Sequence, residues 1–168
     1  MGLMDTNPYA PPKAFVADIV SREASPPLWN PNAAARWSLV FSPVFGAFLH
    51  MKNWEALGEP AKAAAAKVWV IALLSLLIVV PTAIMFWPDL QSLSGPLGIV
   101  LLISWYSSSG RSQVHYVKQR FGQDYPRRGW GKPLLIALAA VVGYFVVLVA
   151  LATALAMLTG VGIAGAGS

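Results

Sequence analysis

The sequence contains no cysteine and few charged residues. Without cysteine, disulfide bonds, thiolate catalysis and cysteine metal sites are excluded. Charged residues make up 11% of the chain and apolar residues 57%, whereas a soluble domain has about 25% charged residues. The 168 residues are enough for one domain. However, a chain with so few charged residues has too little polar surface to cover a water-soluble domain. The composition therefore indicates an integral membrane protein.

Charge is completely absent from two long runs, residues 90–110 and 133–168. Each run is long enough to contain a membrane span, which needs about 20 mostly apolar residues. Between them lies the basic segment, residues 111–132, in which Asp124 is the single acid. We expect this segment to contact anionic lipid headgroups or a cytoplasmic partner through its basic and aromatic side chains. These are Arg111, Lys118, Arg120, Arg127, Arg128, Lys132, Tyr125 and Trp130.

The apolar runs predict an all-α membrane protein with three transmembrane helices and a fourth, shorter element. The order of the predicted parts follows the chain. A proline-rich flexible tail covers residues 1–32, and a helical membrane domain covers 33–159. A glycine-rich tail covers 160–168. Within the membrane domain the predicted spans are 68–87, 92–110 and 133–158, and the shorter element is 33–51.

Residues 33–51 allow two interpretations. The apolar part, from Trp37 to Met51, would make only about 22 Å of helix, which is short of a roughly 30 Å hydrocarbon core. Pro43 and Gly46 also interrupt it. It is either a poor complete span, or a re-entrant segment with its break at Pro43 and Gly46. The sequence alone leaves both open.

Orientation follows from the positive charges, because lysine and arginine concentrate in cytoplasmic loops. The basic segment should therefore be cytoplasmic, and the loop at Asp89 and the C-terminus periplasmic. Lys13, Arg22 and Arg36 favour a cytoplasmic N-terminal tail, which would require residues 33–51 to be re-entrant. If residues 33–51 span instead, the tail lies outside.

Small residues recur along one stripe of the last predicted span. In lipid, small side chains let helix backbones approach closely, and packing then supplies the energy of association. We expect this stripe to be a helix-packing face, either against the other spans or against a second copy or another membrane protein. It consists of Ala139, Gly143, Ala150 and Ala154.

The chain lacks the residues that chemistry or ion coupling would need. No Asp, Glu, Lys, Arg or His sits in the middle of the three predicted spans, which disfavours a coupled transporter. His50 and His115 are too few for a metal site without a carboxylate cluster, so we expect interfacial hydrogen bonding from them. No nucleophile–base constellation, phosphate-binding loop or nucleic-acid motif is present. We predict no enzyme activity, no cofactor, no metal and no nucleic-acid partner.

Two stretches resemble a group of small bacterial inner-membrane proteins for which no activity is assigned. They are WNPNAAARWSLVFSPVFGAFLHMKNWEALG and YVKQRFGQDYPRRGWGKPL, and the resemblance covers residues 28–135. It implies a location in the bacterial inner membrane. It implies no cofactor and no site residues.

These observations predict a non-enzymatic, multi-pass inner-membrane protein. We expect it to act through helix packing and its basic segment, as an assembly, regulatory or immunity-type partner of another protein. The alternative is a small oligomeric channel or a transporter subunit, based on the interrupted element at residues 33–51.

Overall fold

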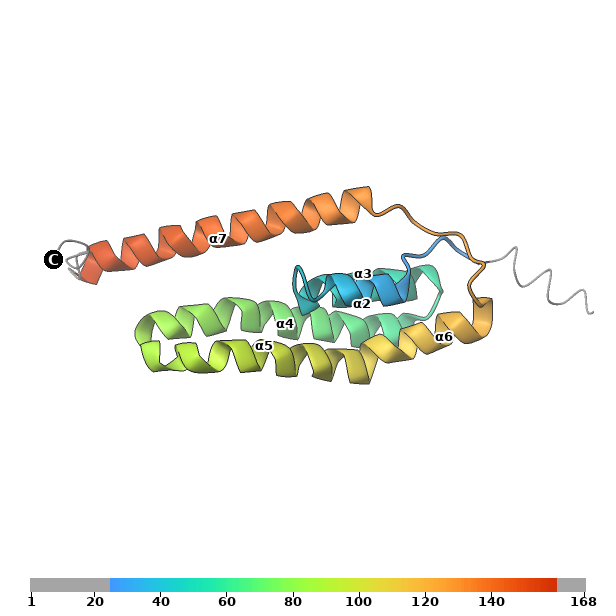
Figure 1. The fold of residues 1–168 in the computed structure, drawn as a ribbon, viewed down its shortest axis with the longest axis horizontal. Helices are drawn as coiled ribbons and strands as arrows, with labels where there is room; N and C mark the ends of the chain where they lie inside the picture. Colours follow the sequence, from blue (N-terminus) through green and yellow to red (C-terminus); the bar gives the residue numbers. More distant parts are fainter. Residues whose placement is uncertain (1–24, 160–168) are drawn as a thin grey trace, which may run out of the picture.

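The computed structural model describes residues 25–159, and these residues form helices joined by short connections (Figure 1). The helices, in chain order, are α2 (Pro31–Trp37), α3 (Pro43–Ala56), α4 (Pro60–Phe86), the 3-10 turn η1 (Pro88–Leu90), α5 (Gln91–Trp105), the π-helical segment η2 (Tyr106–Gly110), α6 (Arg111–Phe121) and α7 (Gly131–Thr159).

Proline marks where several helices begin. Pro31, Pro43 and Pro60 occupy the first turns of α2, α3 and α4, where the missing N–H has no partner within the helix anyway. Glycine marks two helix ends: Gly58 and Gly122 adopt positive φ angles of 70° and 65°, which only glycine accepts without strain. Gly122 caps the end of α6.

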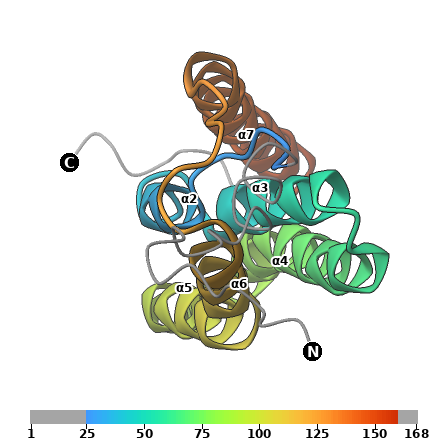
Figure 2. The same cartoon turned by 90° about the vertical axis from the view of Figure 1, so that its right-hand side faces the viewer.

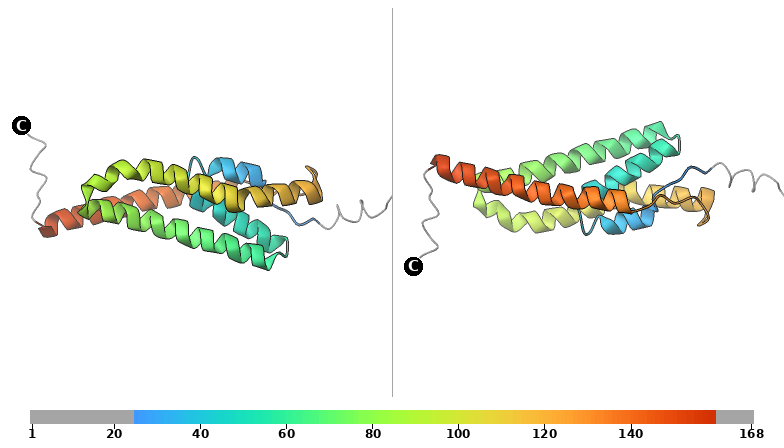
Figure 3. Two further views of the ribbon diagram at one scale, coloured as in Figure 1. Left: turned by 90° about the horizontal axis from the view of Figure 1, so that it is seen from below. Right: turned by 90° about the horizontal axis from the view of Figure 1, so that it is seen from above.

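The helices form layers. The antiparallel pair α4–α5 makes one layer, α7 makes another, and the α2–α3 hairpin lies between them at one end (Figures 1 and 2). Seen from above, α7 runs lengthwise over the α4–α5 pair (Figure 3). The helices α5, η2 and α6 follow one another without a loop. The end of the molecule that holds α6 and the start of α7 is called the basic end below.

The α2–α3 hairpin extends only part of the way along α4. Ala47 of α3 packs against Leu73 of α4 and Trp105 of α5, so the hairpin lies beside the first half of α4. Its two outer ends both lie at the basic end, and its turn, residues 38–42, lies near the middle of α4 (Figure 1).

Close packing holds the hairpin together. A Cβ on Gly46 would collide with the Ser38 hydroxyl and come within 2.6 Å of the Trp105 ring. The absence of a side chain at Gly46 therefore lets α2, α3 and α5 approach one another. Pro43 is the first residue of α3, so the chain breaks just before Pro43, whereas Gly46 lies inside the helix.

The backbone of the hairpin turn is largely satisfied within the hairpin. The N–H groups of Leu39, Val40 and Phe41 all donate to carbonyl groups of the last turn of α2. Ser38 donates both its N–H and its hydroxyl to the Ala34 carbonyl. Leu39 and Val40 are exposed, with 72% and 68% of their surface accessible. The turn is therefore apolar outside and hydrogen-bonded inside.

Two helices, α4 and α7, are long and apolar enough to cross a membrane, judged by length and composition. Helix α4 covers the predicted span 68–87 except for its last residue, Trp87, and α7 contains the predicted span 133–158. The third prediction, a span over 92–110, is shown only as helical structure: α5 has 15 residues and gives way to the π-helical segment after Trp105. The helical class of the protein is confirmed, and the number of spans is not.

Helix α7 contacts the rest of the molecule sparsely. Its inward side carries Ala137 and Tyr144, while most of its large apolar side chains are exposed. The Tyr144 hydroxyl donates a hydrogen bond to the Leu77 carbonyl of α4 at 2.9 Å. Pro81 lies four residues after Leu77 and has no N–H, so this carbonyl has no ordinary helical partner. Tyr144 supplies the donor that Pro81 removes.

Two sequence predictions need correction here. The predicted flexible tail of residues 1–32 extends too far, because Leu28 is fully buried and α2 begins at Pro31. The remainder of that tail and the predicted tail at 160–168 lie outside the described residues. The small-residue stripe does not pack against the other helices, since all four of its members are exposed: Ala139, Gly143, Ala150 and Ala154.

Candidate functional site

A buried asparagine joins the start of the hairpin to α3. Asn53 is fully buried. Its Oδ1 accepts from the Trp29 N–H at 3.0 Å, and its Nδ2 donates to the Trp29 carbonyl at 2.8 Å. One carboxamide thus pairs with both backbone groups of Trp29, as a neighbouring strand would. Nδ2 also donates to Gln113 Oε1 of α6 at 3.3 Å, so every polar atom of this amide is used.

The same network fastens α6 to α3. Gln113 is fully buried, and its Nε2 donates to the His50 carbonyl at 2.8 Å. The His50 ring is also fully buried, and its Nε2 lies 3.1 Å from the Pro31 carbonyl. A carbonyl only accepts hydrogen bonds, so Nε2 carries the proton. The start of α2, helix α3 and helix α6 are therefore joined by fully buried polar groups. Separating such groups from their partners is costly.

The basic segment is attached to the residues before α2. Leu28 donates its N–H to the Pro126 carbonyl at 3.0 Å and accepts from the Arg128 N–H at 2.9 Å. The Arg128 guanidinium stacks over the Trp29 ring, 4.6 Å from its centre, and Trp29 Nε1 donates to the Gly129 carbonyl at 3.2 Å. These contacts fix the path of the basic segment after α6.

A second polar cluster connects α6 to the start of α4. The Tyr116 hydroxyl donates to Glu59 Oε1 at 2.6 Å, and Arg120 donates to Tyr116 at 3.1 Å. Lys62 lies 3.4 Å from Glu59 and 4.2 Å from the centre of the Tyr116 ring. The hydrogen bond from Tyr116, aided by Lys62 and Arg120, lowers the pKa of the Glu59 carboxyl. The same bond raises the pKa of the Tyr116 phenol.

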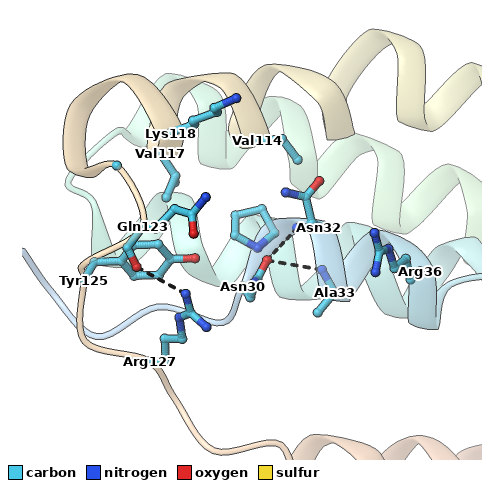
Figure 4. Close-up of a pocket in the computed structure, with 12 residues that line it drawn as sticks. Asn30, Asn32, Ala33, Arg36, Val114, Val117, Lys118, Gln123, Tyr125 and Arg127 are labelled. Atoms are coloured by element: carbon cyan, nitrogen blue, oxygen red, sulfur yellow. Dashed lines mark hydrogen bonds between the residues drawn. The ribbon is translucent and has the colours of Figure 1, made fainter.

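A basic pocket of about 340 Å³ opens between α2, α6 and the residues that follow α6 (Figure 4). Of the residues that the structure describes, three cations line it, Arg36, Lys118 and Arg127, and no carboxylate does. Burial raises the pKa of the Tyr125 phenol, which keeps this lining residue a neutral donor at physiological pH. The carboxamides of Asn30, Asn32 and Gln123 and the apolar residues Pro31, Ala33, Val114 and Val117, together with Gly122, complete the lining.

Within the pocket, several groups are already arranged by bonds to the backbone. Asn30 Oδ1 accepts from the N–H groups of Asn32 and Ala33, so its Nδ2 is the atom left for a ligand. Arg127 donates to the Gln123 carbonyl at 3.2 Å. Figure 4 shows Arg36 at one end of the pocket and Arg127 near the other, with the amides between them.

The structure brings together only part of the predicted contact set. Lys118, Tyr125 and Arg127 meet in the pocket. Arg120 and Arg128 are engaged in the contacts described above. The remaining three do not line the pocket: Arg111 donates to His115 at 3.4 Å, Lys132 is exposed in the first turn of α7, and Trp130 lies half-buried just before α7.

Sequence reasoning missed two features of this end. The first is Arg36, which comes from the hairpin and not from the basic segment. The second is the buried network of Asn53, Gln113 and His50. For both histidines we predicted hydrogen bonding at the interface. His50 is instead fully buried and bonds within the network, and His115 lies exposed on α6. The sequence did contain a signal for the network, because polar Asn53 and Gln113 lie beside apolar helix faces. Nothing in the sequence, however, indicates that these two residues contact each other.

In residues 25–159 no group of three or more His, Asp or Glu side chains could hold a metal ion. The arrangement is suited to holding an anion: three cations, several amide donors and a phenol line the pocket, and no acid among residues 25–159 lines it. No family model, curated protein or solved structure matches this chain.

Proposed function

We propose that this chain is a non-enzymatic, multi-pass protein of the bacterial inner membrane that docks a partner at its cytoplasmic basic end. In this proposal α4, α7 and the continuous α5–η2 helix cross the bilayer, and the α2–α3 hairpin re-enters from the cytoplasmic side. The partner is an acidic segment of another membrane protein, and docking serves assembly or regulation.

The hairpin geometry supports the re-entrant arrangement. Both of its outer ends lie beside the basic segment, and its turn lies near the middle of α4. Irregular backbone inside a bilayer requires its hydrogen bonds to be satisfied by protein, and the N–H groups of Leu39, Val40 and Phe41 are satisfied. The positive charges favour the cytoplasm for this end.

The observation that carries the docking proposal is the fixed shape of the basic end. Leu28 holds the backbone of Pro126 and Arg128, and Asn53 holds Trp29. Cations that are already positioned lose less conformational freedom on binding, so a larger share of the contact energy appears as affinity. Arginine and aromatic side chains also dominate interface hot spots, and Tyr125, Arg127 and Trp130 are concentrated here.

Cysteine labelling tests the topology. Because the chain contains no native cysteine, each introduced cysteine is the one thiol available for labelling. Single cysteines at Thr6, Lys62, Ser94 and Arg120 are treated in intact cells with a membrane-impermeant thiol reagent. We expect labelling at Ser94 and protection at the other three. Labelling at Thr6 would show that residues 33–51 cross the membrane and would refute the re-entrant hairpin.

Photo-crosslinking in cells tests docking. A photoreactive amino acid at Trp130 should give an adduct of one discrete mass, and charge reversal by Arg127→Glu should abolish it. The same amino acid at Ser94, at the opposite end of the helices, is the control and should give no such adduct. Adducts of equal yield at both positions would contradict a docking surface at the basic end.

A second candidate is a small oligomeric channel, for which the partly inserted hairpin is the supporting feature. A conducting path needs polar groups along its wall, whereas Leu39 and Val40 at the turn are apolar and exposed. A flux assay in proteoliposomes distinguishes the two candidates, and solute flux above that of empty vesicles would favour the channel.

A further inference from the structure

The three cations of the basic pocket lie at different depths along the helices. Arg127 lies beside Leu28, before α2 begins. Arg36 lies five residues beyond Pro31, which is roughly 8 Å further along α2 toward the hairpin turn. Its neighbour Ala35 packs against the cluster that contains Leu73, Trp105 and Trp69. Arg36 is therefore nearer than Arg127 to the apolar part of α4, which carries Trp69, and tryptophan favours the membrane interface.

Phospholipids place their phosphate at this interface, with the headgroup extending outward from it. From the depth of its cations and the chemistry of its lining, we infer that the basic pocket binds the headgroup of an anionic phospholipid that carries hydroxyl groups and no amine, such as phosphatidylglycerol. Arg36 holds the phosphate, and Lys118 and Arg127 lie around the outer part of the headgroup. This inference rests on the proposed placement of the basic end at the membrane surface.

The lining explains the choice of headgroup. Asn30 Nδ2, the carboxamides of Asn32 and Gln123 and the Tyr125 hydroxyl provide hydrogen bonds for headgroup hydroxyls. An ammonium group, as in phosphatidylethanolamine or phosphatidylserine, would meet three cations and no carboxylate from the described part of the chain. Like charges brought together in this way disfavour binding. The volume of about 340 Å³ falls in the range of small-molecule sites, roughly 300–1,000 Å³.

The pocket also differs from a generic attraction between basic residues and an anionic surface. Such attraction contributes on the order of 1 kcal/mol for each lysine or arginine near the surface, regardless of position. In that case Lys132, which is exposed at the start of α7 and does not line the pocket, would count as much as Arg36. At a specific site, Arg36 contributes more to lipid affinity than Lys132 does.

The experiment measures lipid binding to the purified full chain in a neutral detergent. Short-chain phosphatidylglycerol is titrated by tryptophan fluorescence and by native mass spectrometry, alongside phosphatidylserine and phosphatidylcholine. We expect phosphatidylglycerol to bind at least tenfold more tightly than phosphatidylserine, although both carry one net negative charge. Equal affinity for the two would overturn the inference.

Matched variants locate the site. Arg36→Gln and Lys118→Gln should each weaken phosphatidylglycerol binding about tenfold, since a bond to a charged group is worth about 1.5–3 kcal/mol. Lys132→Gln removes the same charge outside the pocket and should leave affinity unchanged. A loss of equal size in Lys132→Gln would indicate surface attraction only. Thermal unfolding of each variant verifies that it is folded, and Arg36 and Lys118 are both exposed.

Soluble glycerol phosphate distinguishes a lipid from a free phosphate ester. It should compete only at concentrations far above those of the short-chain lipid, because it lacks the acyl chains that anchor the headgroup. Competition at equal concentration would assign the pocket to a soluble ligand and overturn the lipid assignment. All these measurements use purified protein, so they can fail while the topology and docking tests in cells succeed, and the reverse.

Discussion

The basic end and helix α7 are held in place in opposite ways. At the basic end the hairpin, α6 and the residues before α2 are joined by fully buried Asn53, Gln113 and His50. Helix α7 is apolar along most of its length, yet most of its large apolar side chains are exposed, and the Tyr144 hydroxyl links it to α4. Apolar side chains alone do not drive helices together in lipid, because the lipid tails are equally apolar. Buried polar groups and close packing make the difference.

The largest effect should come from removing the central amide of the basic end. Asn53→Leu leaves the Trp29 N–H, the Trp29 carbonyl and Gln113 Oε1 without a partner. The Trp29 groups are partly buried and Gln113 Oε1 is buried, so at about 1–3 kcal/mol for each group left without a partner we expect a loss of at least about 3 kcal/mol in the free energy of unfolding. Denaturant unfolding in detergent, followed by tryptophan fluorescence, measures it. Asn32→Leu, at an exposed position, is the control and should change stability little.

A smaller loss should follow from filling the closest helix contact. Gly46→Val places a side chain against Ser38 and the Trp105 ring, and overpacking of this kind costs about 1–3 kcal/mol. The matched control is Gly143→Val in α7, where an added Cβ meets nothing within 4 Å. Equal loss of stability in both variants would mean that α7 packs as tightly as the hairpin. It would contradict the difference in packing between the basic end and α7.

The link between α7 and α4 should be weaker still. Tyr144→Phe removes the hydrogen bond to the Leu77 carbonyl, and interhelical hydrogen bonds in membranes average about 0.6 kcal/mol. Pro81→Ala restores an N–H that can satisfy the same carbonyl from within α4. In a double-mutant cycle, the cost of Tyr144→Phe should therefore shrink when alanine occupies position 81. Strict additivity of the two changes would refute the role assigned to Pro81.

The smallest effect is a dependence on pH at the contact between α4 and α6. Because the pKa of Glu59 is lower in the folded chain than its ordinary value of 4.5, the charged carboxylate favours folding. This contribution is present above pH 4.5 and is lost as the pH falls through the lowered pKa. Thermal unfolding at pH 7 and pH 3 should show it, and Tyr116→Phe should reduce the difference. An unchanged difference in that variant would contradict the role of Tyr116.

The sequence predicted the features that depend on local composition. Helices α4 and α7 follow from continuous apolar runs. For residues 33–51 the sequence left two interpretations open, because length and proline content suit both a short span and a re-entrant hairpin. The proposed function adopts the second, and the labelling experiment tests it.

The candidate site was harder to predict, because its parts come from distant positions. Arg36 and Arg127 belong to different charge groups in the sequence, and only the pairing of Leu28 with Pro126 and Arg128 brings them to one pocket. In the same way, Asn53 and Gln113 are 60 residues apart. No local pattern encodes such pairs, since each polar residue resembles an isolated exception in an apolar helix.

The attachment of the hairpin also sets an order on biosynthesis. Trp29 donates to the carbonyl of Gly129, which lies 100 positions later in the chain. Asn53 likewise bonds to Gln113, which is synthesised 60 residues after it. A ribosome produces the hairpin well before it produces these partners. The hairpin therefore reaches its final position only after α4, α5 and α6 have been made. Until then its buried amides need water or a chaperone, so a truncated nascent chain that ends before Gln113 should be a substrate for membrane quality control.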